Sequence, residues 1–350
     1  MKILDIIIIF LGILFKYLLC YGINQTILYA LLALICFITL INIYNLKVKK
    51  KELLKIMLFL IISIFFVILK RDVNFLISFL FSIIIIRKND KSFIKVFFFS
   101  SLILFTLTIF FSWVGILESN NLVRYKKEII TIRYSLGFEH PNTVFLYFLP
   151  LALGGYYLYN NKVSYYILLI LSSSILYNLC DSRTGYICTL SIILFHFIVT
   201  PKLLKKKIFR FVLNHSILIL TIFTIIIAVL YGNDKTNLIS SMFSGRPYYL
   251  NYYIQNGLIF TLLGTNLTKG YVLDNFYIHM LVQLGIIGYL IYYQIYKEGI
   301  KKINYEKKII VILIIFLIYG LLETNVIIGS INFIFPILIK NLIINYKGKR

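Results

Sequence analysis

Charged residues, prolines and cysteines are scarce in this sequence. Only 14% of its 350 residues are charged, whereas 60% are hydrophobic. A soluble domain needs more charge to cover its surface, so this composition excludes a water-soluble globular protein. No stretch is polar and long enough to form a separate soluble domain. Residues 1–350 are therefore expected to form a single transmembrane domain.

The cysteines give no sign of a metal site. Cys20, Cys36, Cys180 and Cys188 lie in or beside apolar runs and lack the spacing of metal ligands. We expect them to be small hydrophobic residues that face lipid or the protein interior. Accordingly, no metal and no cofactor is predicted.

Acidic residues are few: 13 Asp and Glu stand against 36 Lys and Arg, which gives a formal net charge of +23. Such a charge can indicate a nucleic-acid-binding protein. Here, however, the basic residues form short clusters between apolar runs rather than one basic surface. This distribution follows the positive-inside rule of membrane proteins, and no nucleic-acid partner is expected.

Apolar runs that could cross a hydrocarbon core of roughly 30 Å recur along the whole chain. They predict an all-α integral membrane protein, a polytopic bundle of about 12 transmembrane helices. The short pair 53–69 and 73–86 could instead form one re-entrant hairpin. The expected spans are residues 4–22, 26–46, 53–69, 73–86, 93–113, 143–160, 163–180, 184–200, 211–231, 275–296, 309–323 and 328–346.

The basic clusters orient this bundle. With the N-terminus in the cytoplasm, most Lys and Arg residues fall in cytoplasmic loops, and the C-terminus is cytoplasmic as well. Two long loops, at about 114–142 and 232–274, are then extracytoplasmic. In the second loop, the Tyr-rich stretch 247–263 is expected to lie at the outer membrane interface.

Four polar groups of residues fall on this outer side. Arg side chains there suit an anionic lipid headgroup, because Arg binds phosphate oxygens bidentately and keeps its charge. A nearby Glu139, His140 or Asp274 could serve as a general base for a sugar hydroxyl. The groups are Arg133–Asn142, Asp181–Gly185, Ser244–Pro247 and Leu273–His279.

Each group also has a structural interpretation. Arg183 could pair with Asp181 at a helix end, where such an exposed pair contributes little. Arg246 could simply contact lipid headgroups, and residues 140–142 could form the turn that starts a helix. His279 could be a packing residue.

In combination, these motifs resemble the Wzy-like polymerases of O-antigen, capsule and exopolysaccharide assembly. The resemblance covers about residues 120–290 and rests on His-Pro-Asn at 140–142, Ser-Arg-Thr-Gly at 182–185, Ser-Gly-Arg at 244–246 and Asp-Asn-Phe-Tyr at 274–277. It implies a GT-C-like, metal-independent glycosyltransferase of the bacterial plasma membrane, with its active site on the extracytoplasmic side. Such an enzyme joins oligosaccharide repeat units carried on undecaprenyl diphosphate.

The resemblance also implies roles for individual residues. The diphosphate of the donor would be held by Arg183, Arg246 and Arg133. The acceptor or its sugars would contact Asn142, Asn275, Tyr277, His279 and Tyr249. The catalytic candidates are His140, Glu139 and Asp274, and His279 also competes for the role of base. The implied partners are lipid-linked oligosaccharides and membrane lipids, with a chain-length regulator and a flippase as candidate protein partners.

Two alternatives remain open from the sequence. An O-antigen ligase-type transferase would share the long outer loop and the Arg-rich site but would use a different acceptor. A lipid-linked oligosaccharide flippase or transporter would place ionisable residues and Pro breaks near the bilayer midplane. The chain has only five prolines, and its polar residues concentrate in the outer loops instead.

Overall fold

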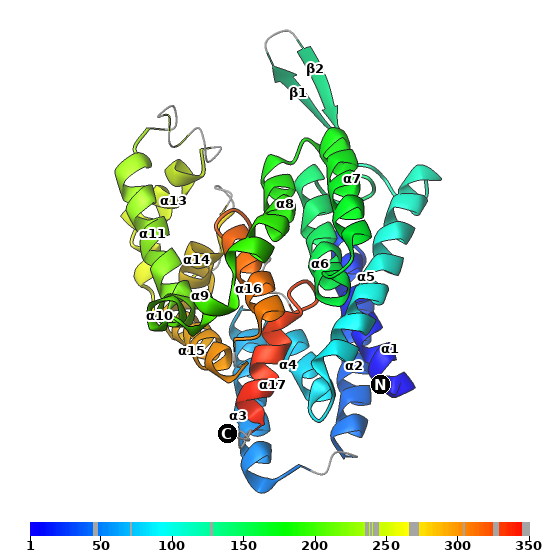
Figure 1. Ribbon diagram of the computed structural model, residues 1–350, viewed down its shortest axis with the longest axis vertical. Helices are drawn as coiled ribbons and strands as arrows, with labels where there is room; N and C mark the ends of the chain where they lie inside the picture. Colours follow the sequence, from blue (N-terminus) through cyan, green and yellow to red (C-terminus); the bar gives the residue numbers. More distant parts are fainter. Residues whose placement is uncertain are drawn as a thin grey trace.

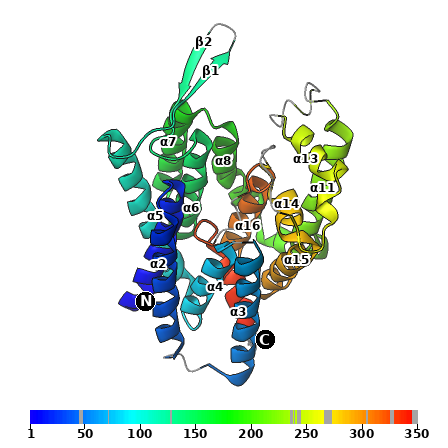
Figure 2. The same cartoon turned by 180° about the vertical axis from the view of Figure 1, so that it is seen from behind.

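The computed structural model describes all residues except 45–47, 71, 127–128, 235–237, 239, 241–244, 266–272, 304, 325–328 and 345–350. Ser244 of the Ser-Gly-Arg motif therefore lies outside the described residues. The described chain forms a bundle of helices with one β-hairpin that projects from one end (Figure 1). We call this end of the bundle the hairpin end. Helices α1, α2 and α3 line the face seen in Figure 2.

The elements follow in chain order. The N-terminal half contains α1 (Ile3–Cys20), α2 (Gln25–Tyr44), α3 (Lys50–Lys70), α4 (Asn74–Ile85), α5 (Asp90–Trp113), β1 (Leu122–Lys126), β2 (Ile129–Arg133), α6 (Pro141–Tyr159) and α7 (Val163–Cys180). The C-terminal half contains α8 (Arg183–Ile198), α9 (Pro201–Lys205), α10 (Lys207–Asn214), α11 (Ser216–Tyr231), α13 (Arg246–Gln255), η1 (Leu258–Phe260), α14 (Phe276–His279), the π-helical turn η2 (Met280–Leu284), α15 (Gly285–Lys302), α16 (Lys307–Tyr319) and α17 (Ile334–Ile343).

Every apolar run expected to span the membrane contains a helix. The prediction of a purely helical chain needs one correction, because residues 122–133 of the first long loop form the antiparallel pair β1–β2. The short helix α9 and the first half of α10 also occur where only a basic loop was expected, whereas the second half of α10 falls within the expected span 211–231. Span eleven, expected to end at residue 323, ends at Tyr319 as helix α16.

Length and composition make the described part of the chain compatible with a membrane-embedded protein. Six of its helices are long and apolar enough to cross a bilayer, or seven if α10 and α11, which meet at a bend of 69°, form one span. At 1.5 Å per residue, α4 and α17 are only about 18 Å and 15 Å long, short of a roughly 30 Å core. The count of twelve spans is therefore not confirmed.

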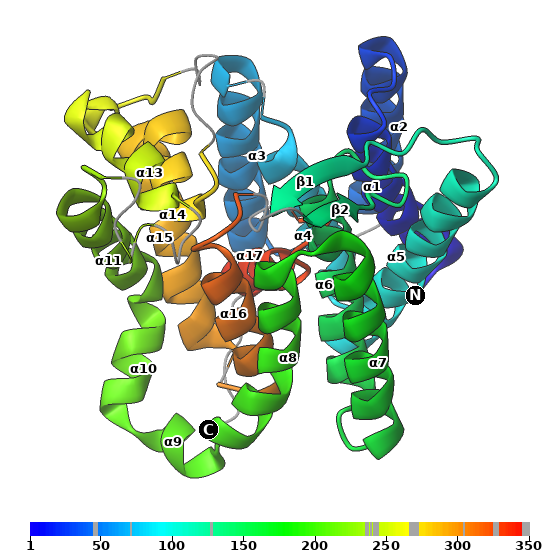
Figure 3. The ribbon, with the colours of Figure 1, turned by 90° about the horizontal axis from the view of Figure 1, so that it is seen from above.

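Helices α4 and α17 form the centre of the bundle, where they pack against each other and α15 packs against α17 (Figure 3). Every residue of α4 from Ile77 to Ile85 is buried, because its side chains meet other helices on all sides. Lys340 of α17 is only 2% exposed, and its Nζ donates to the Lys88 carbonyl and pairs with Asp90. Those partners explain how a cation is tolerated in an otherwise apolar helix.

The helix that begins at Phe276 is interrupted by a backbone contact with the preceding loop. Gly285 has φ +71°, and a Cβ there would come within 2.2 Å of the Gly264 nitrogen, so only glycine fits. The loop also compensates the break, because Thr265 N donates to the Val282 carbonyl and Ile286 N donates to the Thr261 carbonyl. Residues 261–265 are thereby fixed to the bundle.

Candidate functional site

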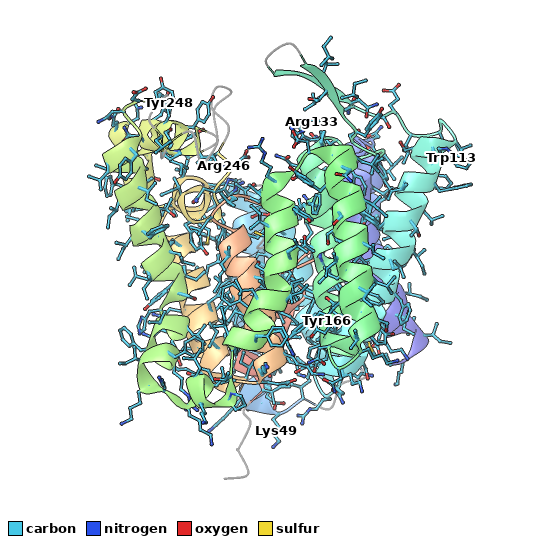
Figure 4. The ribbon with its side chains drawn as sticks, turned by 45° about the horizontal axis from the view of Figure 1, so that its top comes forward. Lys49, Trp113, Arg133, Tyr166, Arg246 and Tyr248 are labelled. Carbon is cyan, nitrogen blue, oxygen red and sulfur yellow. The ribbon has the colours of Figure 1, made fainter. Side chains whose placement is uncertain are left out.

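Arg246 lies between two carboxylates at the hairpin end, the end that also carries Arg133 and lies opposite Lys49 (Figure 4). Its Nη2 is 3.8 Å from Oδ2 of Asp274 and 3.9 Å from Oε1 of Glu323. Both distances are longer than a hydrogen bond, so the attraction is electrostatic only. The Arg246 Nε and the Glu323 Oε1 are buried without a hydrogen-bond partner. This cluster therefore retains unused donors and acceptors.

The two carboxylates meet because α14 begins against the end of α16. Asn275 caps α14 by accepting from Ile278 N, and its Nδ2 donates to the Leu321 carbonyl across 2.8 Å. Phe276 N adds a bond of 2.8 Å to the Gly320 carbonyl. Asp274 and Glu323 flank these contacts in sequence, so the backbone brings them together.

Burial shifts the pKa of both carboxyls. Glu323 lies in the turn beyond α16, and its side chain is 12% exposed. Burial, and then the charge of Asp274, raise the pKa of Glu323 to about 8, although Arg246 lowers it. Burial also raises the pKa of Asp274, which is 38% exposed, while Arg246 and His140 lower it. Glu323 is thus the group that titrates near neutral pH.

His140 joins this cluster to the start of α6. Its Nδ1 accepts a hydrogen bond from Asn142 N at 3.1 Å, so the imidazole is the N-cap of α6. Because Nδ1 is an acceptor, the proton of the neutral ring is on Nε2. Burial and then Arg133 lower the pKa of His140, whereas Asp274 and Glu139 raise it. In this state His140 offers a donor rather than a basic nitrogen.

Arg133 holds the base of the hairpin against two helix ends. Its Nε donates to the Cys180 carbonyl at 2.9 Å, at the C-terminus of α7, where a cation is also favoured by the helix dipole. Its Nη2 donates to Oδ1 of Asn142 at 2.8 Å. The side chains of Arg133 and Asn142 are therefore already engaged with each other.

Arg183 is exposed at the first position of α8. Among the described residues it forms no hydrogen bond or ion pair, so the alternative pairing with Asp181 is not found. The preceding Ser182 is 2% exposed, and its Oγ has no hydrogen-bond partner. The guanidinium of Arg183 is free to bind a ligand.

The remaining predicted residues differ in accessibility. Tyr277 is fully buried, and its hydroxyl donates to the Leu317 carbonyl at 2.7 Å, so in this conformation it is a core residue that cannot reach a sugar. Asn275 is equally committed to internal hydrogen bonds. His279 of α14 keeps an Nδ1 without a hydrogen-bond partner. Tyr249 lies in α13 with its ring against Tyr248, and Glu139 is exposed beside His140.

Glu323 was not among the residues predicted from the sequence, because it was assigned to the end of an apolar span. A signal was nevertheless present. Glu323 closes a long apolar run and has no Lys or Arg within several residues of it. An acidic residue in such surroundings is costly unless it is functional or paired elsewhere in the fold.

Within the described ranges, no three His, Cys, Asp or Glu side chains are grouped as a metal site would require. Comparisons with protein-family models, with curated proteins and with solved structures find no match to this chain.

Proposed function

We propose that this protein is a membrane-embedded polysaccharide polymerase of the bacterial plasma membrane. It joins oligosaccharide repeat units carried on undecaprenyl diphosphate and moves the growing chain onto the next lipid-linked unit. The observation that carries the proposal is the partly buried Arg246, whose guanidinium makes no close hydrogen bond with either neighbouring carboxylate. A diphosphate would give that guanidinium the bidentate partner that it lacks.

In this proposal the chain crosses the membrane about twelve times. Because α4 and α17 are too short to cross it alone, neighbouring residues in the sequence supply the rest of these two spans. Both termini are cytoplasmic, and the hairpin end faces outward. Lipid-linked substrates then reach the cluster from the outer leaflet, while the basic loops stay on the cytoplasmic side.

Arg246 and Arg183 bind the donor diphosphate and stabilise the charge that develops on it as it leaves. Arg133 is mainly a positioning residue, because its guanidinium donates to the Asn142 side chain and to the Cys180 carbonyl at the end of α7. His140 donates from Nε2 to an oxygen of the acceptor or the donor. The exposed tyrosine Tyr248 and its neighbour Tyr249 offer ring faces to sugars.

A cell-based experiment tests this function. Arg246→Ala and Arg183→Ala should each remove the polymer, with losses of about 100-fold or more, while membrane insertion is preserved. Single lipid-linked repeat units should accumulate at the outer face. Lys207→Ala is the matched control, because Lys207 is an exposed cation on α10.

Other outcomes identify the alternatives. Accumulation of repeat units at the inner face would indicate a flippase. Polymer of normal length that is not transferred to lipid A core would indicate a ligase-type enzyme. Normal polymer in both Arg variants would contradict diphosphate binding at these residues.

A further inference from the structure

We propose that Glu323 accepts the proton of the attacking sugar hydroxyl, an inference that rests on the proposed polymerase function. The position of Glu323 within the site supports it. Glu323 N donates to the Tyr319 carbonyl at 3.0 Å, so the helical turn continues past the end of α16. This turn sets the carboxyl beside Arg246, where a diphosphate donor would be bound.

Three of the other candidate bases are less suited to the task. His140 uses Nδ1 to cap α6 and carries its proton on Nε2, so the neutral ring has no free lone pair. Glu139 is exposed to solvent. Asp274 is about three times as exposed as Glu323, 38% against 12%, so it lies closer to solvent than the base of a water-excluded site would.

The surroundings of Glu323 make its carboxylate a proton acceptor that is effective near neutral pH. Charged or titratable groups face it from each neighbouring element: Arg246 from α13, Asp274 from the start of α14, Cys188 from α8 and Tyr319 from α16. The Tyr319 hydroxyl is buried and has no hydrogen-bond partner, as is also true of the Glu323 Oε1. Burial and the charge of Asp274 raise the pKa of Glu323 to about 8, and a base with a pKa near the working pH is the most effective.

The reaction balances without a further reactant. The acceptor oxygen forms a bond to the anomeric carbon of the donor as its proton passes to the Glu323 carboxylate. The bond between that carbon and the diphosphate oxygen breaks, and its electron pair leaves on the diphosphate, which Arg246 neutralises. Glu323 then releases the proton to water at the outer surface. The charge of Asp274 raises the proton affinity of Glu323.

The test uses the purified full-length protein in liposomes with defined undecaprenyl-diphosphate-linked repeat units. Glu323→Gln should lower kcat by about 100-fold or more and leave the affinity for the donor unchanged. Glu323→Asp keeps a carboxylate and should retain measurable activity. Glu306→Gln is the matched control, since Glu306 is the N-cap at the opposite end of the same helix, α16.

The pH profile provides a second readout that does not depend on the folding of the Gln variant. Wild-type kcat should rise as the pH increases through about 8. Asp274→Asn removes a negative charge that raises the Glu323 pKa, so the rise should move to lower pH. If the wild-type protein elongates chains, two results would overturn the role of Glu323 but not the polymerase function. One is a Glu323→Gln variant that is as active as wild type, and the other is an unchanged pH profile in Asp274→Asn. A wild-type protein that elongates nothing overturns the polymerase function and this inference together.

Discussion

The side-chain amide of Asn275 donates a hydrogen bond to the backbone carbonyl of Leu321 across 2.8 Å. This contact joins the start of α14 to the turn that follows α16. It therefore fixes Asp274 relative to Glu323, although Asn275 itself is only 1% exposed and its side chain is used in internal hydrogen bonds. If the protein is the proposed polymerase, chain elongation should depend on this contact as well as on the charged residues.

Replacement of this amide gives the first prediction. Asn275→Asp keeps the oxygen that caps α14 but loses the Nδ2 donor and adds a negative charge beside Asp274. We expect a loss of about 1–3 kcal/mol of stability, because the Leu321 carbonyl is left without its partner. The melting temperature in detergent should fall, and chain elongation should slow. An unchanged melting temperature would mean that the contact does not hold the site together.

His140 is predicted to be replaceable by Asn. Asn can accept the Asn142 N–H as an N-cap and can still donate from its amide, so His140→Asn should keep activity within a few-fold of wild type. His140→Ala loses both functions and about 1 kcal/mol of helix capping. Turnover of the two purified variants should therefore differ clearly. Equal and severe losses in both would indicate that the imidazole is the base after all.

The sequence predicts the helices well and the centre of the site only in part. Each apolar run proved to contain a helix, because a membrane helix must satisfy its own backbone and so reads as one continuous run. Length could not show that α4 and α17 are short central helices, since this depends on which neighbours bury them. The hairpin of residues 122–133 was missed because its alternating apolar residues lie in a segment that was assigned to a long loop.

At the site, Arg246 and Asp274 were both predicted, and their proximity was expected because both were assigned to the same side of the bundle. Glu323 lies beside them because hydrogen bonds join the start of α14 to the turn after α16. These bonds cannot be predicted from residue spacing in the sequence. Tyr277 is the opposite case, a residue that was predicted to contact the substrate but is buried in the structure. A tyrosine beside Asp-Asn resembles a sugar-binding residue, yet its side chain faces the Leu317 carbonyl in the core.

The break in the helix after His279 is predicted to require glycine. In Gly285→Ala the new Cβ meets the Gly264 backbone and the residue must keep φ +71°, so stability should fall by more than about 2 kcal/mol. Gly257→Ala is the control, because Gly257 also has positive φ (+67°) but nothing lies within 4 Å of its Cβ position. It should lose only about 1 kcal/mol. Similar melting temperatures for both variants would argue against the close contact with Gly264.

The stability of the protein should depend on pH through Glu323. Its pKa is raised from an ordinary value of 4.5 to about 8, so the folded protein binds this proton more tightly than the unfolded chain does. That stabilisation is complete below the ordinary pKa and is lost as the pH rises through about 8. The melting temperature of wild type relative to Glu323→Gln should fall by a few degrees over this window and then level off. A wild-type melting temperature that rises relative to that of Glu323→Gln over this window would contradict the raised pKa.

Elongation by the purified protein is the most direct test of the account. Wild-type protein in liposomes, supplied only with undecaprenyl-diphosphate-linked repeat units, should produce a ladder of longer lipid-linked chains and release undecaprenyl diphosphate. Arg246→Ala, inserted equally well, should leave the single units unchanged. A wild-type protein that leaves every unit unjoined, or an Arg246→Ala variant that forms the same ladder, would contradict the proposal that this buried arginine serves polymerisation.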